Sequence, residues 1–181
     1  DLDKNGFIDT YDQMAIGGTE NPEIVYGFGV NLRWKELDFG AMFQGIGRTW
    51  RILSSNIMPA SNKGSMYNIF DNYQDRWTVD NQSQDVFYPR ADYGPNANNS
   101  QKSTWWLRNM SFLRLKNLEL GYSCPKKWLQ GFVISNARVF VRGTNLLTFS
   151  KFNLWDPELA TGDGAKYPAM KSVSVGFDIT F

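Results

Sequence analysis

The feature of this sequence that most restricts its fold is an alternation of apolar and small polar residues at a period of two. The stretch 172–181 reads SVSVGFDITF, with Val, Val, Phe, Ile and Phe on one parity and Ser, Ser, Gly, Asp and Thr on the other. Side chains of a β-strand point alternately to its two faces. The pattern therefore predicts a strand with one apolar and one polar face.

The same alternation predicts four further strands. They are expected at residues 25–34, 37–43, 112–122 and 137–146. Lys35 and Glu36 form a tight connection that joins the first two into a hairpin. Within the third strand the apolar parity changes between Leu115 and Leu118, which predicts either a β-bulge there or a rise of the strand above the buried zone.

The residue types on the polar face of these strands distinguish between two kinds of β protein. In a soluble sandwich that face carries Lys and Glu, whereas here it is rich in Gly, Asn, Asp, Ser and Thr. An aromatic-rich apolar face, with short turns alternating with long loops, is typical of outer-membrane barrels. We predict an all-β fold, an antiparallel transmembrane β-barrel, with the soluble sandwich as the alternative. Since the smallest such barrels have about eight strands, five strands predict a portion of one.

The composition removes most catalytic chemistry. The chain has no His, which excludes imidazole bases, and its single cysteine, Cys124, has no base beside it. The carboxylate pairs that a glycoside hydrolase would need are available in loops, as Asp156 with Glu158 or Asp71 with Asp75. A net charge of +1 provides no basic field for nucleic acid. We predict that the protein is not an enzyme and binds no nucleic acid.

The first residues, DLDKNGFIDTYD, match a calcium loop of the EF-hand type. Such a loop places oxygen ligands at alternating positions, with a glycine at its sharp turn. The predicted ligands are Asp1, Asp3, Asn5, the backbone carbonyl of Phe7, Asp9 and Asp12, with Gly6 at the turn. Asp12 stands where the motif has the longer Glu, which predicts weaker binding. The alternative is a solvated turn without an ion.

Four segments, in this order, resemble the C-terminal blocks of the SusC/RagA-type TonB-dependent outer-membrane transporters of Bacteroidota. They are DLDKNGFIDTYDQMAIGGTENPEIVYGFGVNLRWKELDFGAMFQG, WLRNMSFLRLKNLELGY, GTNLLTFSKFNLWDPE and YPAMKSVSVGFDITF. The resemblance implies a plugged barrel of roughly 22 strands, of which residues 1–181 would supply the last five. The chain begins within the calcium motif, so we expect it to be the C-terminal part of a longer protein whose plug domain lies outside it. The terminal Phe181 resembles the insertion signal of such barrels.

The family's topology places the end of the chain in the periplasm. It implies that residues 1–23 form an extracellular loop with the calcium motif, and that 49–110 and 147–168 are long extracellular loops. The connections at Lys35 and around Cys124 would be periplasmic turns. An ion in the first loop would then have a structural role.

The resemblance implies TonB-dependent import of oligomeric nutrients, either glycan or peptide, across the cell outer membrane. The implied partners are a SusD-like surface lipoprotein, membrane lipid, and TonB, the last through an N-terminal region absent from this chain. The alternative function is a calcium-binding extracellular adhesion or glycan-binding β module. Such a module should carry a second copy of the motif, and the sequence has none.

Tryptophans in or beside the predicted outer loops are the candidate substrate contacts, because indole rings stack on sugars. The substrate-binding candidates are Trp50, Trp77 and Trp155, with Trp105 and Trp106 in similar positions. The alternative is that these residues belong to the membrane-interface belt or to the core of a loop.

Overall fold

The computed structural model of this chain describes residues 1–54, 70–91, 96, 98–99 and 101–181. Their contacts divide the chain into two compact units. The first unit comprises residues 1–18, 51–108 and 161–165, and the second comprises 19–50, 109–160 and 166–181. Among the described residues, no helix is both long enough and apolar enough to cross a membrane.

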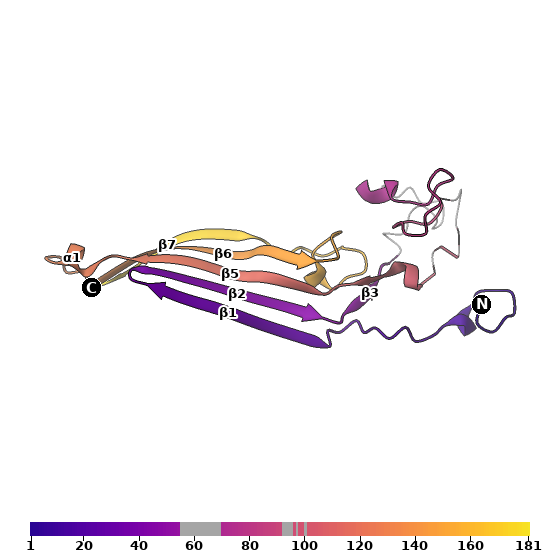
Figure 1. The fold of residues 1–181 in the computed structure, drawn as a ribbon, viewed down its shortest axis with the longest axis horizontal. Helices are drawn as coiled ribbons and strands as arrows, with labels where there is room; N and C mark the ends of the chain where they lie inside the picture. The colour runs from indigo at the N-terminus through magenta and orange to yellow at the C-terminus, as the bar shows by residue number, and fades with distance from the viewer. Residues whose placement is uncertain (55–69, 92–95, 97, 100) are drawn as a thin grey trace. The chain divides into compact units, whose positions relative to one another are not determined.

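The second unit contains a five-stranded antiparallel sheet in the order β1-β2-β5-β6-β7. Its strands are β1 (Ile24–Trp34), β2 (Leu37–Gly47), β5 (Phe112–Ser123), β6 (Asn136–Ser150) and β7 (Ser172–Thr180). They lie side by side in Figure 1, where the short helix α1 (Lys126–Leu129) occupies the connection between β5 and β6. The predicted five antiparallel strands are confirmed.

Two local features of the sheet follow the sequence pattern. The turn between β1 and β2 consists of Lys35 and Glu36, and Lys35 has a φ of 53°, a left-handed conformation that tight hairpin turns use. The register of β5 against β6 shifts between Leu115 and Asn117, and its register against β2 shifts at the same level. The predicted bulge is therefore confirmed.

β6 is longer than the sequence pattern predicts. It includes residues 147–150, which the pattern places in the loop 147–168, so that boundary is wrong. The alternation is interrupted at Asn145, which has a φ of 52° where the β5–β6 register shifts. Leu147 and Phe149 then resume the exposed apolar parity. A bulge breaks the sequence periodicity without ending the strand.

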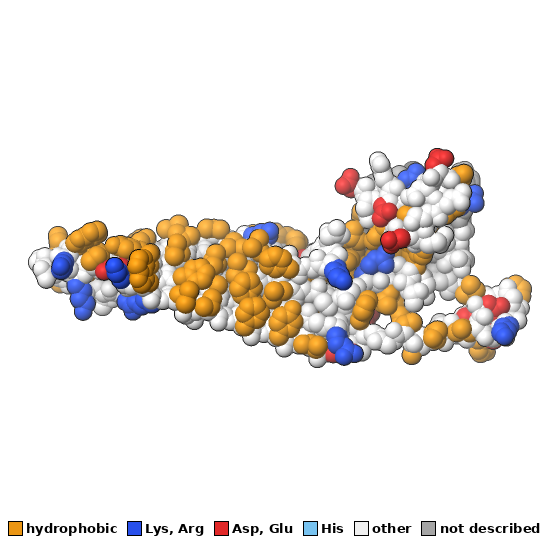
Figure 2. Space-filling view, viewed as in Figure 1, with side chains coloured by type: hydrophobic (Ala, Val, Ile, Leu, Met, Phe, Trp, Pro, Cys, Tyr) orange, Lys and Arg blue, Asp and Glu red, His pale blue; other side chains and the backbone are white. Residues whose placement is uncertain are grey.

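One face of the sheet is apolar and uncovered. Figure 2 shows hydrophobic side chains gathered over its strands. On β7, Val175 and Phe177 are 72% and 74% exposed, and every residue of β1 is exposed. A contiguous apolar surface of this kind indicates contact with another apolar phase.

The first unit has short regular segments around a small aromatic core. The predicted loop 49–110 contains β3 (Trp50–Ile52), which pairs with β4 (Leu107–Asn109), and the 3-10 helices Asp71–Gln74 and Thr104–Trp106. Two stretches of that loop, 55–69 and 92–95, lie outside the described residues, as do residues 97 and 100.

The core of the first unit is formed by Leu53, Tyr88 and Trp106, each at most 1% exposed. Tyr88 and Trp106 pack edge to face with a centroid distance of 6.3 Å. The polar ends of both rings are satisfied, since the Trp106 Nε1 donates to the Asn99 carbonyl at 3.0 Å and the Tyr88 hydroxyl donates to Asn72 Oδ1 at 3.2 Å. Burial raises the pKa of Tyr88. The packing is that of a water-soluble core.

Candidate functional site

Three carboxylates converge at the start of the chain. Asp1, Asp3 and Asp12 each offer an oxygen within 4.8 Å of the others. The N–H of Asn5 donates to Oδ1 of Asp1 and of Asp3, each at 3.1 Å, and the N–H of Gly6 donates to Asp1 Oδ2 at 2.8 Å. Gly6 has a φ of 87°, so it makes the sharp turn that the motif requires.

Asp12 closes this loop onto its beginning. Its carboxylate accepts the N–H of Asp9 at 2.8 Å and the N–H of Leu2 at 2.5 Å, and its side chain is only 4% exposed. These two donors, that of Asp9 first, hold the pKa of the Asp12 carboxyl below its usual value. The loop is thus organised around the half-buried carboxylate of Asp12, whose two oxygens accept N–H groups from Leu2 and Asp9.

The other predicted ligands make contacts within the loop. Asn5 Nδ2 donates to Asp3 Oδ2 at 2.9 Å, and Asn5 Oδ1 accepts the N–H of Phe7 at 2.8 Å. The Asp9 carboxylate is not among the three that converge, because it accepts the N–H of Tyr11 and caps the 3-10 helix Thr10–Asp12. The converging atoms are all carboxylate oxygens, which is the donor type that calcium prefers.

The polar face of the sheet carries ion pairs across four strands. Arg138 on β6 contacts Asp38 on β2, Glu119 on β5 at 2.7 Å and Asp178 on β7 at 3.4 Å. Arg142 contacts Glu119 at 2.6 Å. The sequence places these charges on the polar parity, but their pairing depends on the strand register and could not be read from it. Charged pairs of this kind suit a hydrated barrel interior.

A second ionic cluster surrounds Arg114 on β5, whose side chain is 2% exposed. Arg114 pairs with Asp156 and with Glu158, the latter at 2.8 Å, and Lys116 lies 3.4 Å from Glu158. The two carboxylates considered for catalysis are therefore bound to one buried arginine. In the other candidate pair, Asp75 Oδ2 accepts the backbone N–H of Phe87 at 3.1 Å. These contacts indicate structural roles.

The tryptophans predicted to contact substrate differ in their surroundings. Trp50, Trp77 and Trp155 are all half-buried, and their proposed contact with cargo stays a prediction. Trp106, by contrast, is 1% exposed and belongs to the loop core, so the alternative considered for it is correct. Trp105 is half-buried and its Nε1 donates to the Phe87 carbonyl at 3.0 Å.

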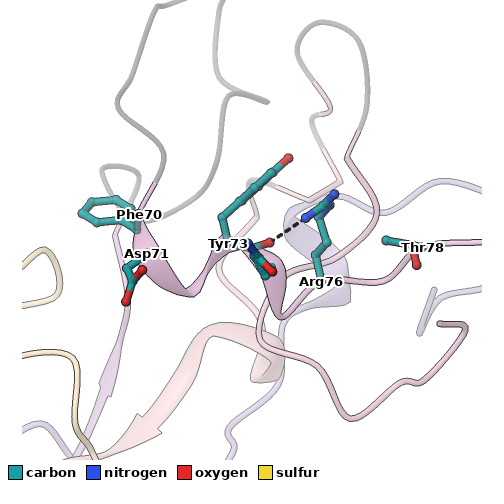
Figure 3. Close-up of a pocket in the computed structure, with 6 residues that line it drawn as sticks. Phe70, Asp71, Tyr73, Arg76 and Thr78 are labelled. Carbon is teal, nitrogen blue, oxygen red and sulfur yellow. Dashed lines mark hydrogen bonds between the residues drawn. The ribbon is translucent and has the colours of Figure 1, made fainter. Parts of the chain in front are cut away.

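An open cavity of about 700 Å³ lies beside the 3-10 helix Asp71–Gln74 (Figure 3). Its lining residues are Phe70, Asp71, Tyr73, Gln74, Arg76 and Thr78. The Arg76 guanidinium lies 4.8 Å from the centroid of the Tyr73 ring and donates to the Tyr73 carbonyl at 3.1 Å. No tryptophan lines this cavity, so the tryptophans predicted as substrate contacts do not locate it. The signal available was the run DNYQDR, with Tyr and Arg three residues apart.

Comparison with known proteins gives matches over the whole chain. It is 31% identical to TonB-dependent receptor P26 and 29% identical to TonB-dependent receptor P3, both of Formosa agariphila, with all of the chain aligned in each case. It is 33% identical over 44% of its length to TonB-dependent receptor SusC of Bacteroides thetaiotaomicron. No protein-family profile matches the chain.

Solved structures agree with these relatives. The RagAB peptide importer in its closed-closed state matches 98% of the chain with a TM-score of 0.73 and 32% identity. Its open-open state matches 92% of the chain with a TM-score of 0.71 and 34% identity. The chain spans 19% and 18% of the two Formosa relatives and 20% and 18% of the two solved chains, or about a fifth of their length.

Proposed function

This chain belongs to the SusC/RagA-type TonB-dependent transporters, and we propose that it supplies five strands of an outer-membrane barrel that imports oligomeric nutrients. The observation that supports this most directly is the sheet itself. Its apolar parity is exposed along β1 and β7 while its polar parity carries ion pairs. Such a sheet is suited to lipid on one side and water on the other. In water alone it would expose both its apolar face and its edges to aggregation.

The proposed partners follow from the family. A SusD-like lipoprotein would cover the extracellular opening, and TonB would act through a region outside this chain. The long connections, 49–110 and the corrected loop 151–171, would face the cell exterior. The two-residue turn at Lys35 and the turn that contains α1 would face the periplasm, since barrels of this kind have short periplasmic turns.

Growth of the host organism on defined oligomers tests this proposal. Deleting the gene for the full-length transporter should prevent growth on one class of oligomer, glycan or peptide, and leave growth on the corresponding monomers unchanged. Deleting the gene for TonB should reproduce the defect. Equal growth of the deletion strain and the parent on every oligomer tested would contradict the proposal.

We propose the cavity beside Tyr73 as a cargo contact. Its aromatic rings and its amide, hydroxyl and charged groups match the mixed lining of ligand sites, and Arg76 offers donors toward carbonyl or carboxylate oxygens. Tyr73→Ala in the full-length transporter should raise the concentration of oligomer needed for half-maximal uptake. Tyr167→Ala is the matched control, because Tyr167 is 81% exposed and lines no part of this cavity. Equal effects of the two changes would exclude the site.

We also propose that the loop at Asp1, Asp3 and Asp12 binds calcium as a structural ion. A bound ion should have oxygen ligands at about 2.3 to 2.6 Å, whereas magnesium would require about 2.0 to 2.1 Å. Asn5 and the Phe7 carbonyl complete the expected set, and Asp9 would have to release the N–H of Tyr11 to join it.

Protease resistance tests the calcium proposal. In the full-length transporter, removing calcium with a chelator should expose residues 1–22 to cleavage without changing the barrel. Asp1→Ala combined with Asp3→Ala should give the same cleavage with calcium present. If the double variant and the parent are cut equally in both conditions, the loop is a turn that does not depend on an ion.

A further inference from the structure

The connection between β5 and β6 carries an unusual combination of exposed side chains. We call residues 124–135, which include α1, the basic turn. It has two lysines, Lys126 and Lys127, and no acidic residue. Trp128, Phe132 and Val133 within it are 66%, 70% and 85% exposed. Large apolar side chains at this exposure indicate a surface that is covered by something else.

The backbone of the basic turn is held to the sheet at both ends. The N–H of Cys124 donates to the Ala137 carbonyl at 2.7 Å, and the N–H of Ser135 donates to the Thr180 carbonyl at 2.7 Å. Between them, the N–H of Trp128 donates to the Pro125 carbonyl at 2.9 Å. The backbone of the turn is therefore anchored beside the start of β6 and the end of β7, with its indole and lysines exposed.

The hairpin turn of β1 and β2 adds a similar pair at the same end of the sheet. Trp34 is 68% exposed and continues the apolar parity of β1, and the Lys35 ammonium lies 5.0 Å from its ring centroid. The Glu36 carbonyl accepts the N–H of Ser123 at 2.7 Å, which joins this turn to the end of β5. Hydrophobic and basic side chains occur together at this end of the sheet in Figure 2.

We infer that this end of the sheet binds anionic phospholipid headgroups of the inner leaflet of the outer membrane. Trp34 continues the apolar parity of β1, the strand face proposed to contact lipid, and this supplies the location. Trp and Lys are the side chains that anchor proteins at the boundary between hydrocarbon and headgroups. Within the described chain, Lys126 and Lys127 make no ion pair, so both charges are available to a lipid phosphate.

The charge balance favours an anionic lipid over a zwitterionic one. The carboxylates nearest to this end that lie on strands, Asp38 and Asp178, are bound by Arg138, and Glu36 is the acidic residue of the hairpin turn. Across the two turns, Lys35, Lys126 and Lys127 outnumber the two anionic groups, the Glu36 side chain and the terminal carboxylate of Phe181. The selectivity rests on the proposed membrane location, because the short turns must lie at the periplasmic side for inner-leaflet lipid to reach them.

Lipid titration of the full-length transporter tests the inference. The delipidated protein, purified in mild detergent, is mixed with phosphatidylglycerol or phosphatidylethanolamine, and bound lipids are counted by native mass spectrometry. The parent should bind phosphatidylglycerol more tightly. Lys126→Gln with Lys127→Gln should weaken that binding by about fivefold for each lysine removed, with little change for phosphatidylethanolamine. Trp128→Ala with Phe132→Ala should weaken binding of both lipids.

Lys171→Gln is the matched control, because Lys171 is exposed at the opposite end of β7 and should leave lipid binding unchanged. Equal binding of the two lipids by the parent, or an undiminished preference in the double-lysine variant, would overturn the inference. An equal loss of phosphatidylglycerol binding in Lys171→Gln would also overturn the inference. The proposed transport function fails separately, if the transporter is absent from the outer membrane or its deletion leaves uptake intact.

Discussion

The sheet exposes its hydrophobic residues, whereas the first unit, which we call the loop unit, buries them. On β7, Val175 and Phe177 are 72% and 74% exposed, whereas Tyr88 and Trp106 in the loop unit are each 1% exposed. Both regions are rich in aromatic and aliphatic side chains, so composition does not explain the difference. The surrounding medium explains the difference. An apolar strand face in hydrocarbon gains no hydrophobic stabilisation from burial, whereas a loop in water must bury its rings.

The polar groups show the same contrast. In the loop unit the Trp106 Nε1 and the Tyr88 hydroxyl have protein partners inside a small core. In the sheet, Arg138 and Glu119 form ion pairs on the face opposite to the apolar one. One chain therefore contains a region organised for water and a region organised for a lipid boundary.

The largest effect is expected from removing a ring of the loop core. Trp106→Ala should destabilise the loop unit by about 3 to 5 kcal/mol, because it leaves a cavity beside Tyr88. Protease should then cut the full-length transporter within residues 70–108 while the barrel stays resistant to heat in detergent. Val79→Ala is the control, since Val79 is 74% exposed in the same unit. Loss of the barrel together with the loop would show that the two regions are not independent.

A charge on the apolar face of the sheet should give the next largest effect. Val175→Lys near the middle of β7 is expected to cost about 2 to 4 kcal/mol and to reduce insertion into the outer membrane. Ser174→Lys, one residue away on the polar face, should be tolerated. The amount of heat-modifiable barrel in isolated outer membranes measures both. Equal amounts for the two variants would remove the distinction between the faces.

A smaller effect is expected where a loop is tied to the polar face. Asp156→Asn removes a negatively charged partner of the buried Arg114 and should lower the free energy of unfolding by about 1.5 to 3 kcal/mol. The Asn side chain can still cap the 3-10 helix Pro157–Leu159. Glu158→Gln should cost less, because Glu158 is 38% exposed. Hydrogen exchange of residues 151–160 in the full-length transporter checks the order. A larger change for Glu158→Gln would contradict it.

The smallest of these effects is expected in the first loop when the pH is lowered. The pKa of Asp12 is lowered in the folded loop, so its stabilising contribution is present above the ordinary aspartate pKa of about 3.9 and is lost as the pH falls through the lower, folded value. With calcium removed, hydrogen exchange of residues 1–12, corrected for intrinsic rates, should increase below about pH 4. Asp12→Asn should weaken this dependence on pH. If hydrogen exchange in Asp12→Asn depends on pH as it does in the parent, the pH dependence arises from other carboxylates.

The two regions also differ in how far the sequence predicts them. All five strands can be predicted, because each alternates between two media and the change of parity at Leu115 even locates the bulge. The end of β6 cannot be predicted, because Asn145 interrupts the alternation, which resumes only at Leu147 although the strand is continuous. The burial of Trp106 has no periodic signal, since its neighbours in the core come from distant turns of the loop.

Ionic contacts on the polar face are intermediate. The sequence shows that Arg138, Asp38 and Glu119 share a parity, yet their meeting depends on three strands in register. The link from Arg114 to Asp156 spans two elements that no local pattern connects. In the calcium motif the spacing predicts the convergence of Asp1, Asp3 and Asp12 but not the capping contact that draws Asp9 away.

Solvent accessibility along β7 tests most directly the claim that the sheet separates lipid from water. Single cysteines at positions 172–179 of the full-length transporter, with Cys124 replaced, would carry a spin label in a lipid bilayer. Collisions with oxygen, which concentrates in hydrocarbon, should peak at 173, 175, 177 and 179, and collisions with a water-soluble nickel complex should peak at 172, 174 and 178. Accessibility to the two reagents that does not alternate, or that alternates in the opposite sense, would contradict this account.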